Sequence, residues 1–477
     1  MSDKIPFLAA IEVGSHEVIL KIAQVASHGQ ITEVESMSRT INLGSDSYRL
    51  GYTSHTNIKL LIEILEDFNQ RIAIYPDISV VIACTSAIRE SSNNMFLLDQ
   101  IFRQTGLKVK ILSNREEFAG MIRAIRLRMP KFDKLIQEPT LLLDIGSGST
   151  QLTLFDNQKF LFSQNILLGS LRVRDRLSVL EKHTADFKSL MQEYISGDIY
   201  YYRSFLPKTT FYENFVLVGN SLNIWRFLAG LPLEGTVKLK SKIFDKLYDE
   251  ITRSSPLSLI DKYEITEEQA SILLPMSMVI KELFEFTALK YLILPDAVLA
   301  DGLLYHLAEK LEYIEYDQRQ DLDTLSFARE IAKRYYTDLQ HVTQVEKLSL
   351  QLFDELKEEH GLHQRHRFLL QVAAILHNVG KFFTVKQDGI IAYQLIKASD
   401  LVGLSNQEIE LVALLVKHHS DSIQEVSLAQ EILSKQEHMI LVKLSVILSM
   451  ANSLDAGHKT KISKIKTKKK KRYIKIF

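Results

Sequence analysis

The sequence has little of what marks secreted, fibrous or disordered chains. Its 477 residues include one Cys, nine Pro and 19 Gly. The single Cys84 excludes an intrachain disulfide, which fits a reducing cytoplasm. With 46% hydrophobic and 24% charged residues, the composition excludes a disordered chain, a collagen and a low-complexity protein. The length favours two to four domains, at about 100–200 residues per domain.

Long apolar runs are missing as well. None reaches the ~18 residues of a membrane span. The opening MSDKIPFLAAIEVG is not typical of a secretory signal, because its apolar part is short and ends in an acid. We therefore expect a cytoplasmic protein with no membrane partner.

The net charge of zero hides an asymmetry. Residues 458–477 carry ten Lys and Arg and no Asp or Glu, so the rest of the chain has 48 basic against 58 acidic side chains. An acidic body is not expected to bind a long polyanion along its surface. The basic tail can attract nucleic acid or polyphosphate, but without a reading motif the contact would be unspecific. Its weak alternation fits either an edge hairpin or a disordered tail.

Strand patterns and amphipathic helices alternate up to about residue 306, which predicts an α/β fold. An amphipathic helix is expected near Ile58–Ile74. The strands are expected at 7–13, 18–25, 31–43, 79–84 and 108–112, and then at 141–145, 150–155 and 160–165.

An internal repeat connects the two sets of strands. AIEVGSHEVIL (Ala10–Leu20) matches LLDIGSGSTQL (Leu142–Leu152) at an offset of 132 residues. A repeated supersecondary unit predicts two similar α/β halves with a cleft between them. The matched pairs are Glu12 with Asp144, Gly14 with Gly146, and Ser15 with Ser147.

An acid, Gly and Ser at the end of a buried strand suit phosphate chemistry. The Gly brings backbone N–H groups close to a ligand, and the carboxylate can hold Mg²⁺ or orient water. One such turn could equally be a tight hairpin. Two in register favour a phosphate clamp.

Helices replace strands from about residue 307. Capping boxes are predicted at Ser405 with Glu408 and at Thr266 with Gln269. The apolar stretch Phe368–Val379 predicts a central helix that ends at Gly380, and a further helix is expected over His341–Leu356. The predicted domains are two α/β domains over 1–130 and 131–306, an all-α domain over 307–457 and the basic tail over 458–477.

Several motifs, taken together, resemble a known family. AAIEVGSHEVILKIA, ACTSAIRESSN, ILSNREEF, LLLDIGSGSTQL, ILLGSLRV, FVLVGNS and LPDAVLADGLLYHL follow the order found in the Ppx/GppA phosphatases. These are exopolyphosphatases and guanosine pentaphosphate phosphohydrolases with two actin-like (ribonuclease H-like) domains. The resemblance implies a Mg²⁺-dependent hydrolase of phosphoanhydride bonds, with inorganic polyphosphate as the first substrate, guanosine pentaphosphate as the second and a homodimer as the assembly.

The resemblance also implies roles for individual residues. Glu116, in NREEF, falls on the general base, and Asp144 with Glu12 falls on the metal side. Arg89 would support the phosphates with its planar fork. From the residues alone, Glu116 could instead be an acid at a helix start and Arg89 a surface ion-pair residue. The phosphate clamp would consist of Gly14, Ser15, Arg89, Gly146, Ser147, Gly148, Ser149, Thr150 and Gln151.

The sequence departs from the family pattern at the site. Glu12 and His16 replace the usual Asp and Asn of the first turn, and Gln151 replaces an acid of the second. The third glycine loop, Gly219–Asn220–Ser221–Leu222–Asn223, lacks two of the usual glycines and the threonine, and Leu222 would crowd a phosphate. These departures leave two hypotheses: a working phosphohydrolase, or a catalytically impaired sensor that binds polyphosphate or a nucleotide.

The helical part resembles the HD-like domain of the longer family members, but its metal set is broken. The doublet is His377–Asn378 rather than His–Asp, and Asn452 stands at the later acid position, with Asp455 one turn on. Hard divalent metals need carboxylate as well as imidazole. We therefore expect His341, His377, His418 and His419 to be hydrogen-bonded remnants.

Overall fold

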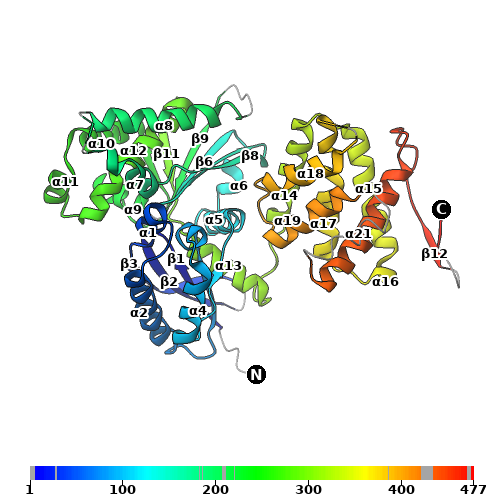
Figure 1. The fold of residues 1–477 in the computed structure, drawn as a ribbon, viewed down its shortest axis with the longest axis horizontal. Helices are drawn as coiled ribbons and strands as arrows, with labels where there is room; N and C mark the ends of the chain where they lie inside the picture. Colours follow the sequence, from blue (N-terminus) through cyan, green and yellow to red (C-terminus); the bar gives the residue numbers. More distant parts are fainter. Residues whose placement is uncertain are drawn as a thin grey trace. The chain divides into compact units, whose positions relative to one another are not determined.

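The computed structural model describes residues 6–26, 29–181, 183–184, 186–206, 211–219, 221–384, 386–419, 433–469 and 474–477. They form two compact units, residues 1–317 and 318–477, which are described separately (Figure 1). The first unit is α/β and contains two sheets. The second consists of helices and a small hairpin.

The first sheet has the strand order β3-β2-β1-β4-β5. The hairpin strands β1, β2 and β3 are antiparallel, and β4 and β5 continue the sheet in parallel. The strands β1 and β4 have the bounds predicted from the sequence. The strands are β1 (Phe7–Val13), β2 (Glu17–Val25), β3 (Ile31–Thr40), β4 (Ser79–Cys84) and β5 (Lys110–Ile111).

Helices cover this sheet and complete the first lobe. Helix α2 (His55–Ile72) starts at the Ser54 cap and buries Leu61, Leu65 and Phe68 against the sheet, as its amphipathic pattern predicts. The other helices are α1 (Leu43–Leu50), α3 (Ser86–Glu90), α4 (Asn94–Thr105), α5 (Asn114–Arg128) and α6 (Phe132–Leu135).

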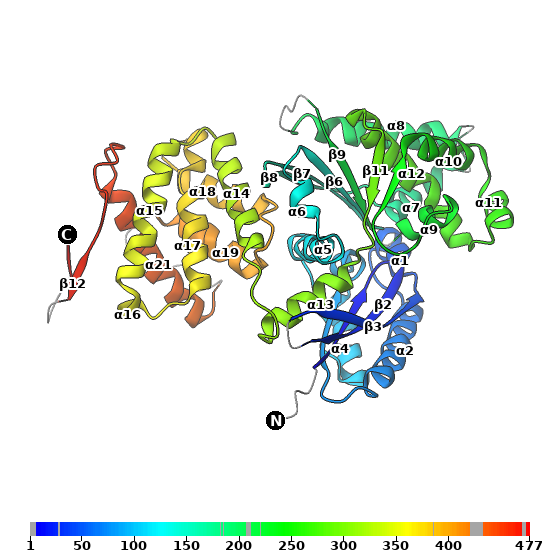
Figure 2. The same cartoon turned by 180° about the vertical axis from the view of Figure 1, so that it is seen from behind.

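The second sheet repeats the topology of the first. Its order is β10-β11-β9-β6-β7-β8, so that β6, β7 and β8 form an antiparallel hairpin set and β9 lies parallel to β6 (Figure 2). The position of β9 matches that of β4 beside β1. The strands are β6 (Thr140–Ile145), β7 (Thr150–Asp156), β8 (Lys159–Ile166), β9 (Asn214–Val218), β10 (Val237–Lys240) and β11 (Tyr291–Leu294).

Helices around the second sheet complete the second lobe, and α13 (Leu299–Lys310) then returns to the first. A Cβ on Gly302 would lie 1.9 Å from the Gly120 carbonyl oxygen, so α13 and α5 cross where both carry Gly. The domain boundaries predicted at residues 130 and 306 stay predictions. The second-lobe helices are α7 (Ser170–Glu181), α8 (Phe187–Arg203), α9 (Leu222–Leu228), α10 (Ser241–Arg253), α11 (Pro256–Tyr263) and α12 (Glu267–Thr287).

The second unit is a bundle of helices. Both capping boxes predicted from the sequence are present, at Ser405 for α19 and at Thr266 for α12 of the first unit. The helices are α14 (Arg319–Arg334), α15 (Leu339–Glu355), α16 (Lys357–His360), α17 (Gln364–Leu376), η1 (Val379–Phe382), α18 (Asp388–Ala398), α19 (Asn406–Lys417) and α21 (Lys435–Leu454). Together with the two α/β lobes, this bundle confirms the predicted fold class.

The prediction for the central helix was wrong at its end. Helix α17 stops at Leu376, and Gly380 lies inside the 3₁₀ turn η1. A Cβ on Gly380 would lie 1.9 Å from the carbonyl oxygen of Asp388. The Gly is therefore needed for close packing against the start of α18, not for a helix end.

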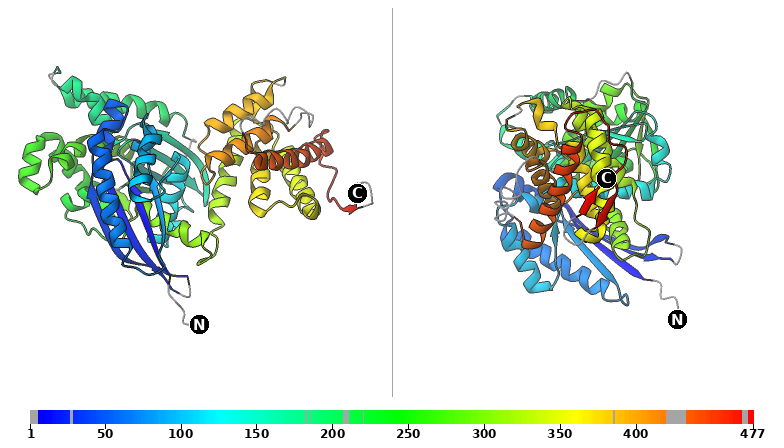
Figure 3. Two further views of the ribbon diagram at one scale, coloured as in Figure 1. Left: turned by 60° about the horizontal axis from the view of Figure 1, so that its bottom comes forward. Right: turned by 90° about the vertical axis from the view of Figure 1, so that its right-hand side faces the viewer.

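The tail forms a small antiparallel hairpin, β12 (Thr467–Lys469) with β13 (Ile474–Ile476) (Figure 3). Of the two alternatives for the tail, the structure shows the hairpin. Residues 470–473, three of which are basic, lie outside the described residues.

One described helix, α21, is long and apolar enough to cross a membrane by length and composition alone. A core helix of a soluble protein passes the same test, so this is weak evidence. Leu441, Leu444 and Leu448 of α21 are buried in the bundle.

Candidate functional site

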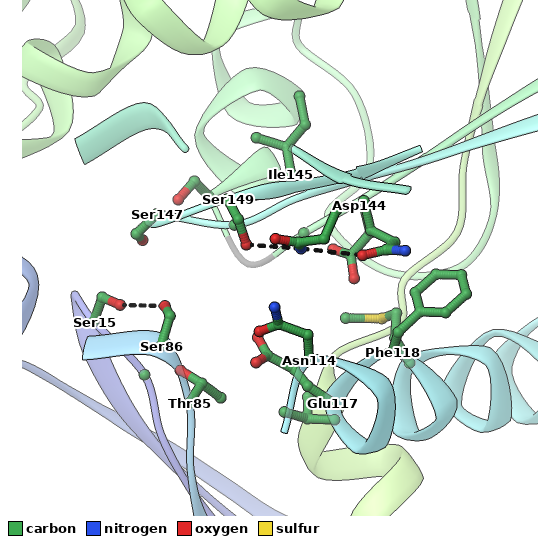
Figure 4. Close-up of a pocket in the computed structure, with 18 of the residues that line it drawn as sticks. Ser15, Thr85, Ser86, Asn114, Glu117, Phe118, Asp144, Ile145, Ser147 and Ser149 are labelled. Atoms are coloured by element: carbon green, nitrogen blue, oxygen red, sulfur yellow. Dashed lines mark hydrogen bonds between the residues drawn. The ribbon is translucent and has the colours of Figure 1, made fainter. Parts of the chain in front are cut away.

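A hollow of about 80 Å³ lies between the two lobes and contains both acid–Gly–Ser turns (Figure 4). Glu117 and Asn114 face it from one side, and Asp144, Ser147 and Ser149 face it from the other. Hydroxyl, amide and carboxylate groups dominate its wall. The lining residues are Glu12, Gly14, Ser15, Thr85, Ser86, Asn114, Glu117, Phe118, Met121, Asp144, Ile145, Gly146, Ser147, Ser149, Gln151, Asn165, Gly219, Ser221 and Leu299.

The first turn follows β1 and is closed by a backbone hydrogen bond from Gly14 N to Glu17 O, 2.9 Å long. The Ser15 hydroxyl lies 2.8 Å from the Tyr48 hydroxyl and 3.3 Å from the Ser86 hydroxyl. Glu12 is buried, and its carboxylate accepts a hydrogen bond from Ala300 N at 3.0 Å. The turn therefore presents its Ser from a fixed backbone.

The second turn follows β6 in the same way, with Gly146 N donating to Ser149 O at 2.9 Å. Gly148 and Thr150 do not face the hollow. A Cβ on Gly148 would lie 2.2 Å from the Tyr48 hydroxyl oxygen, and the buried Thr150 hydroxyl donates to Leu168 O at 2.7 Å. Gly148 thus permits the close approach of Tyr48, and Thr150 fixes the backbone after the turn.

An arginine of the second lobe connects the two turns. The Arg172 guanidinium donates to Gly148 O and lies 4.3 Å from the centre of the Tyr48 ring. Its Nη2 donates to both carboxylate oxygens of Glu90, at 2.7 and 2.6 Å. Because Tyr48 also holds Ser15, Arg172 fixes the turns relative to each other.

The Asp144 carboxyl is strongly perturbed by its position in the hollow. Burial, with the negative charges of Glu117 and Glu12, raises the pKa of Asp144 to about 8. Three carboxylates around one small space repel each other. A cation bound there would relieve this repulsion and favour the ionised form of Asp144.

The structure places Glu116 outside the hollow. Its carboxylate accepts hydrogen bonds from Ser113 N and Oγ and from Lys110 Nζ, in the capping box that starts α5. Burial alone would raise the pKa of Glu116, but the Lys110 and Ser113 hydrogen bonds outweigh it and the net shift is downward. The next residue, Glu117, faces the hollow.

Arg89 does not line the hollow either. Its Nη1 donates to Leu112 O at 2.6 Å and to Glu117 Oε2 at 2.9 Å. Arg89 therefore holds the carboxylate that faces the hollow rather than pointing its own fork at a phosphate. The ion-pair alternative raised from the sequence describes this contact better than the clamp does.

Gln151 faces the hollow as part of an amide network. Its Nε2 donates to the Ser163 hydroxyl at 2.6 Å, and its Oε1 accepts from Asn165 Nδ2 at 3.0 Å. Asn165 Nδ2 also lies 3.1 Å from the Ser149 hydroxyl. The neutral Gln151 thus donates one hydrogen bond and accepts another, whereas an ionised carboxylate at this position could only accept.

Two of the positions that depart from the family pattern, Leu222 and His16, do not line the hollow. Leu222 is buried in the core of the second lobe and does not line the hollow. His16 turns to the second lobe, where its Nδ1 lies 2.8 Å from Glu268 Oε1. Asn220 lies outside the described residues.

Sequence reasoning missed several of the residues that line the hollow. Ser113-x-x-Glu116 has the spacing of a capping box, and that signal could have assigned Glu116 to the helix start and left Glu117 for the site. Thr85, Ser86, Asn114 and Ser221 lie within the motifs that carry the resemblance but are not among the predicted site residues, and Asn165 lies outside those motifs.

The donor set fits a hard divalent cation. Among the described residues no three His, Cys, Asp or Glu side chains form a ready metal cage. Mg²⁺ does not need one, since it usually takes one or two carboxylates and completes its shell with water and substrate phosphate. Asp144, with its raised pKa, and Glu12 supply such oxygens.

Of the histidines singled out in the second unit, His341 and His377 contact each other, and His419 Nδ1 lies 2.7 Å from the backbone carbonyl oxygen three residues earlier. His341 Nδ1 lies 2.9 Å from Asp455 Oδ2, and its Nε2 lies 3.1 Å from Asn452 Oδ1 and 3.3 Å from His377 Nε2. Burial and the nearby His419 and His341 lower the pKa of His377 well below its usual value. The described part of the unit contains no group of three such ligands arranged for a metal ion.

The two lobes of like topology, with a carboxylate- and hydroxyl-lined hollow between them, have an actin-like fold. The sequence profile of the Ppx/GppA phosphatase family matches residues 21–311, and that of Ppx/GppA phosphatase domain III matches residues 326–476. The chain belongs to the Ppx/GppA phosphatase family.

Similar proteins agree with this assignment. Relatives named guanosine-5'-triphosphate,3'-diphosphate pyrophosphatase, from Aliivibrio fischeri and Photobacterium profundum, are 22% identical over 93% of this chain and 87% and 86% of their own. The crystal structure of the Aquifex aeolicus Ppx/GppA family member aligns with a TM-score of 0.53 at 18% identity, over 66% of this chain and all of that one. An exopolyphosphatase from Cytophaga hutchinsonii gives 0.55 at 17% identity, over 64% and 98%.

Proposed function

We propose that the protein hydrolyses the terminal phosphoanhydride bond of inorganic polyphosphate in the hollow between the lobes. The family supports a phosphohydrolase. The observation that carries the proposal is the meeting of Glu117, Asp144 and Glu12 around a hollow lined by hydroxyl, amide and glycine groups.

In this proposal Glu117 is the general base. The contact at 2.9 Å from Arg89 fixes one of its carboxylate oxygens, so that the other can accept a proton from water. Glu116 cannot take this role, because the Ser113 cap and Lys110 hold both of its oxygens. We therefore assign the general-base role to Glu117 rather than to Glu116, the residue that the family resemblance implies.

The phosphate would be held by neutral donors. Ser15, Ser86, Ser147 and Ser149 bring hydroxyls to the hollow, and the glycine turns admit a phosphate close to the backbone. These groups would position the phosphorus for in-line attack by water.

The charges of the hollow imply a cation with the substrate. Its described lining has three carboxylates and no Lys or Arg. A polyphosphate end is itself anionic, so it would be repelled unless a cation neutralised the site. Mg²⁺ held by Asp144 and Glu12 would neutralise part of this charge and would orient a phosphate oxygen of the substrate.

The lining of the hollow supports polyphosphate as the first substrate. Its wall consists mainly of hydroxyl, amide and carboxylate groups, which suit phosphate oxygens and a bound cation, and Phe118 is the only aromatic side chain among its described lining residues. Guanosine pentaphosphate is the second substrate, with its base outside the hollow, since the relatives from Aliivibrio and Photobacterium bear that activity in their names.

A sensor without turnover is the second candidate function. The observation that favours it is Gln151, an amide engaged by Ser163 and Asn165 where the family resemblance implies an acid. Loss of one charge of this kind commonly costs about 10²–10³ in rate.

Phosphate release from polyphosphate and from guanosine pentaphosphate, with and without Mg²⁺, separates the candidates. The proposed hydrolase releases phosphate from polyphosphate only with Mg²⁺. The sensor binds polyphosphate in calorimetry and releases none. Equal absence of binding and release would reject both.

A further inference from the structure

A group of four aromatic rings, three of them exposed, lies on the helical unit. Tyr335 and Tyr336 follow α14, and Phe382 and Phe383 stand at the end of η1. The rings contact one another: the Tyr336 and Phe382 centroids are 5.8 Å apart and stacked, and those of Phe382 and Phe383 are 5.0 Å apart. Tyr335 contacts both Phe rings at 5.9 and 6.0 Å.

These rings are exposed to an unusual degree. Tyr336 is 83% exposed, Phe383 59% and Phe382 52%. Single exposed apolar residues are normal, but a contiguous aromatic group on a surface commonly marks a binding site.

Basic residues accompany the rings in both segments. The segments KRYYT (333–337) and GKFFTVKQ (380–387) contain four Lys or Arg, and Asp338 and Asp388 follow them directly. Lys333, Arg334, Lys381 and Lys386 are exposed. We call the described residues of these segments, 333–337, 380–384 and 386–387, the basic–aromatic patch.

The basic tail starts beside this patch. His458 Nδ1 lies 2.8 Å from Asp338 Oδ2, two residues after Tyr336. The exposed Lys459 and Lys461 follow at once. The patch and the start of the tail therefore belong to one region of the unit.

Helix α15 holds the tail by its backbone and leaves the lysines outside. Gln344 Nε2 donates to Ile462 O, Gln351 accepts from Ile465 N, and Glu355 accepts from Thr467 N. These anchors use no lysine side chain.

The hairpin brings like charges together. Lys468 and Lys475 are directly paired across β12 and β13, and both are exposed. Like charges directly opposite destabilise a strand pair. A two-stranded hairpin is only marginally stable on its own, so an anion between these lysines would stabilise it.

We propose that the basic–aromatic patch and the basic tail bind single-stranded nucleic acid. The aromatic faces stack on bases, and the lysines contact the phosphates without reading a sequence. The rings distinguish this ligand from polyphosphate, which has no base to stack, and from a duplex, whose bases are already stacked. The surface is separate from the proposed hydrolytic hollow and does not depend on it.

Fluorescence anisotropy of a labelled oligouridylate of about 20 nucleotides with the full chain tests the proposal. Replacing Tyr336 and Phe382 together by Ala should weaken binding about 5- to 150-fold for each stacked base lost. The matched control is Tyr200→Ala, since Tyr200 is 77% exposed on α8 of the other unit and should leave the affinity unchanged. Thermal unfolding of each variant shows that the fold is intact.

Two further measurements separate the sources of binding. Lys468→Gln and Lys475→Gln should each lower the slope of log affinity against log salt by about 0.7. Polyphosphate should compete through the lysines, and its affinity should not change in the Tyr336→Ala, Phe382→Ala double variant. The proposal is overturned if the double variant binds oligouridylate as tightly as the wild type does, or if the full chain does not bind it. A wild-type dimer that the double variant converts to a monomer overturns it as well, since a second copy would then occupy the rings.

Discussion

Two groups of ionisable residues, one in each unit, are candidate sites by residue type, but their surroundings in the structure differ. In residues 1–317, Glu12, Glu117 and Asp144 surround a hollow. In residues 318–477, His341 and Asp455 are bonded to each other and fully buried. The first group lines a hollow that a ligand can enter, whereas His341 and Asp455 are hydrogen-bonded to neighbouring groups of the protein. A cluster becomes a candidate site where its charges meet a hollow, not where reactive residue types are merely near.

The same contrast appears within one helix turn. Glu116 and Glu117 are neighbours on α5, yet one carboxylate caps the helix and the other faces the hollow. Helical residues one apart point about 100° away from each other, so two adjacent acids cannot both enter one small space.

The largest expected effect tests this pair. Glu117→Gln should lower phosphate release about 10²–10⁴-fold, because the amide cannot accept the proton of the attacking water. Glu116→Gln should keep the rate within a few-fold, and because Gln also completes a capping box, the free energy of unfolding should fall only by the lost ion pair with the exposed Lys110, about 0–1 kcal/mol. A steady-state phosphate assay with thermal unfolding measures both. A larger rate loss in Glu116→Gln than in Glu117→Gln would reverse the assignment.

A slightly smaller loss is expected for Asp144→Asn, at about 10²–10³ in rate. The variant should also respond weakly to Mg²⁺, which titration of the rate with Mg²⁺ measures. Glu213→Gln, on a described acid outside the lining of the hollow, serves as the matched control. An unchanged Mg²⁺ requirement in Asp144→Asn would place the metal elsewhere.

The raised pKa of Asp144 gives a pH dependence with a definite sign. Because burial and neighbouring acids raise it from 3.8 to about 8, the folded chain holds a proton that the unfolded chain has released. Stability without Mg²⁺ should therefore fall as the pH rises from 3.8 to about 8, and Asp144→Asn should lack this fall. Unfolding midpoints from pH 5 to 9 (about one unit apart) check it. Parallel profiles for both proteins would show that Asp144 ionises freely.

A moderate effect on turnover is expected from changes to Tyr48 and Arg172, which connect the two acid–Gly–Ser turns. Tyr48→Phe removes the hydroxyl that contacts Ser15 and Ser86 at 2.8 Å but keeps the ring under Arg172. Losing two neutral hydrogen bonds of about 0.5–1.5 kcal/mol each should reduce kcat/KM about 5- to 150-fold. Arg172→Lys, which also loses the bidentate contact to Glu90, should cost more. Equal kinetics for Tyr48→Phe and the wild type would mean that Ser15 is positioned without the hydroxyl.

The smallest effect on turnover is expected in the histidine cluster. His341→Ala should leave phosphate release within about twofold, while loss of its buried partners lowers the free energy of unfolding by about 1–3 kcal/mol. Metal analysis of the purified wild type should find no stoichiometric transition metal in this unit. A metal that disappears in His341→Ala would contradict the comparison between the two groups.

Much of the architecture could be predicted from local pattern. The strands β1 and β4 and the repeat of the two acid–Gly–Ser turns follow from residues that are neighbours in the chain, and the structure has them where the pattern places them. Gly380 shows the limit. Its reason is an approach of 1.9 Å between a would-be Cβ and the Asp388 carbonyl, which no local pattern contains.

The sequence by itself determined the duplicated hairpin, the family and the acids that end the buried strands, because period, turn chemistry and motif order are properties of short segments. Only the tertiary structure decided which acid of the Glu116–Glu117 pair faces the hollow and that Arg89 serves Glu117 rather than a phosphate. The physical reason is direction. A carboxylate's role depends on which donors surround it, and those donors come from elements far apart in the chain.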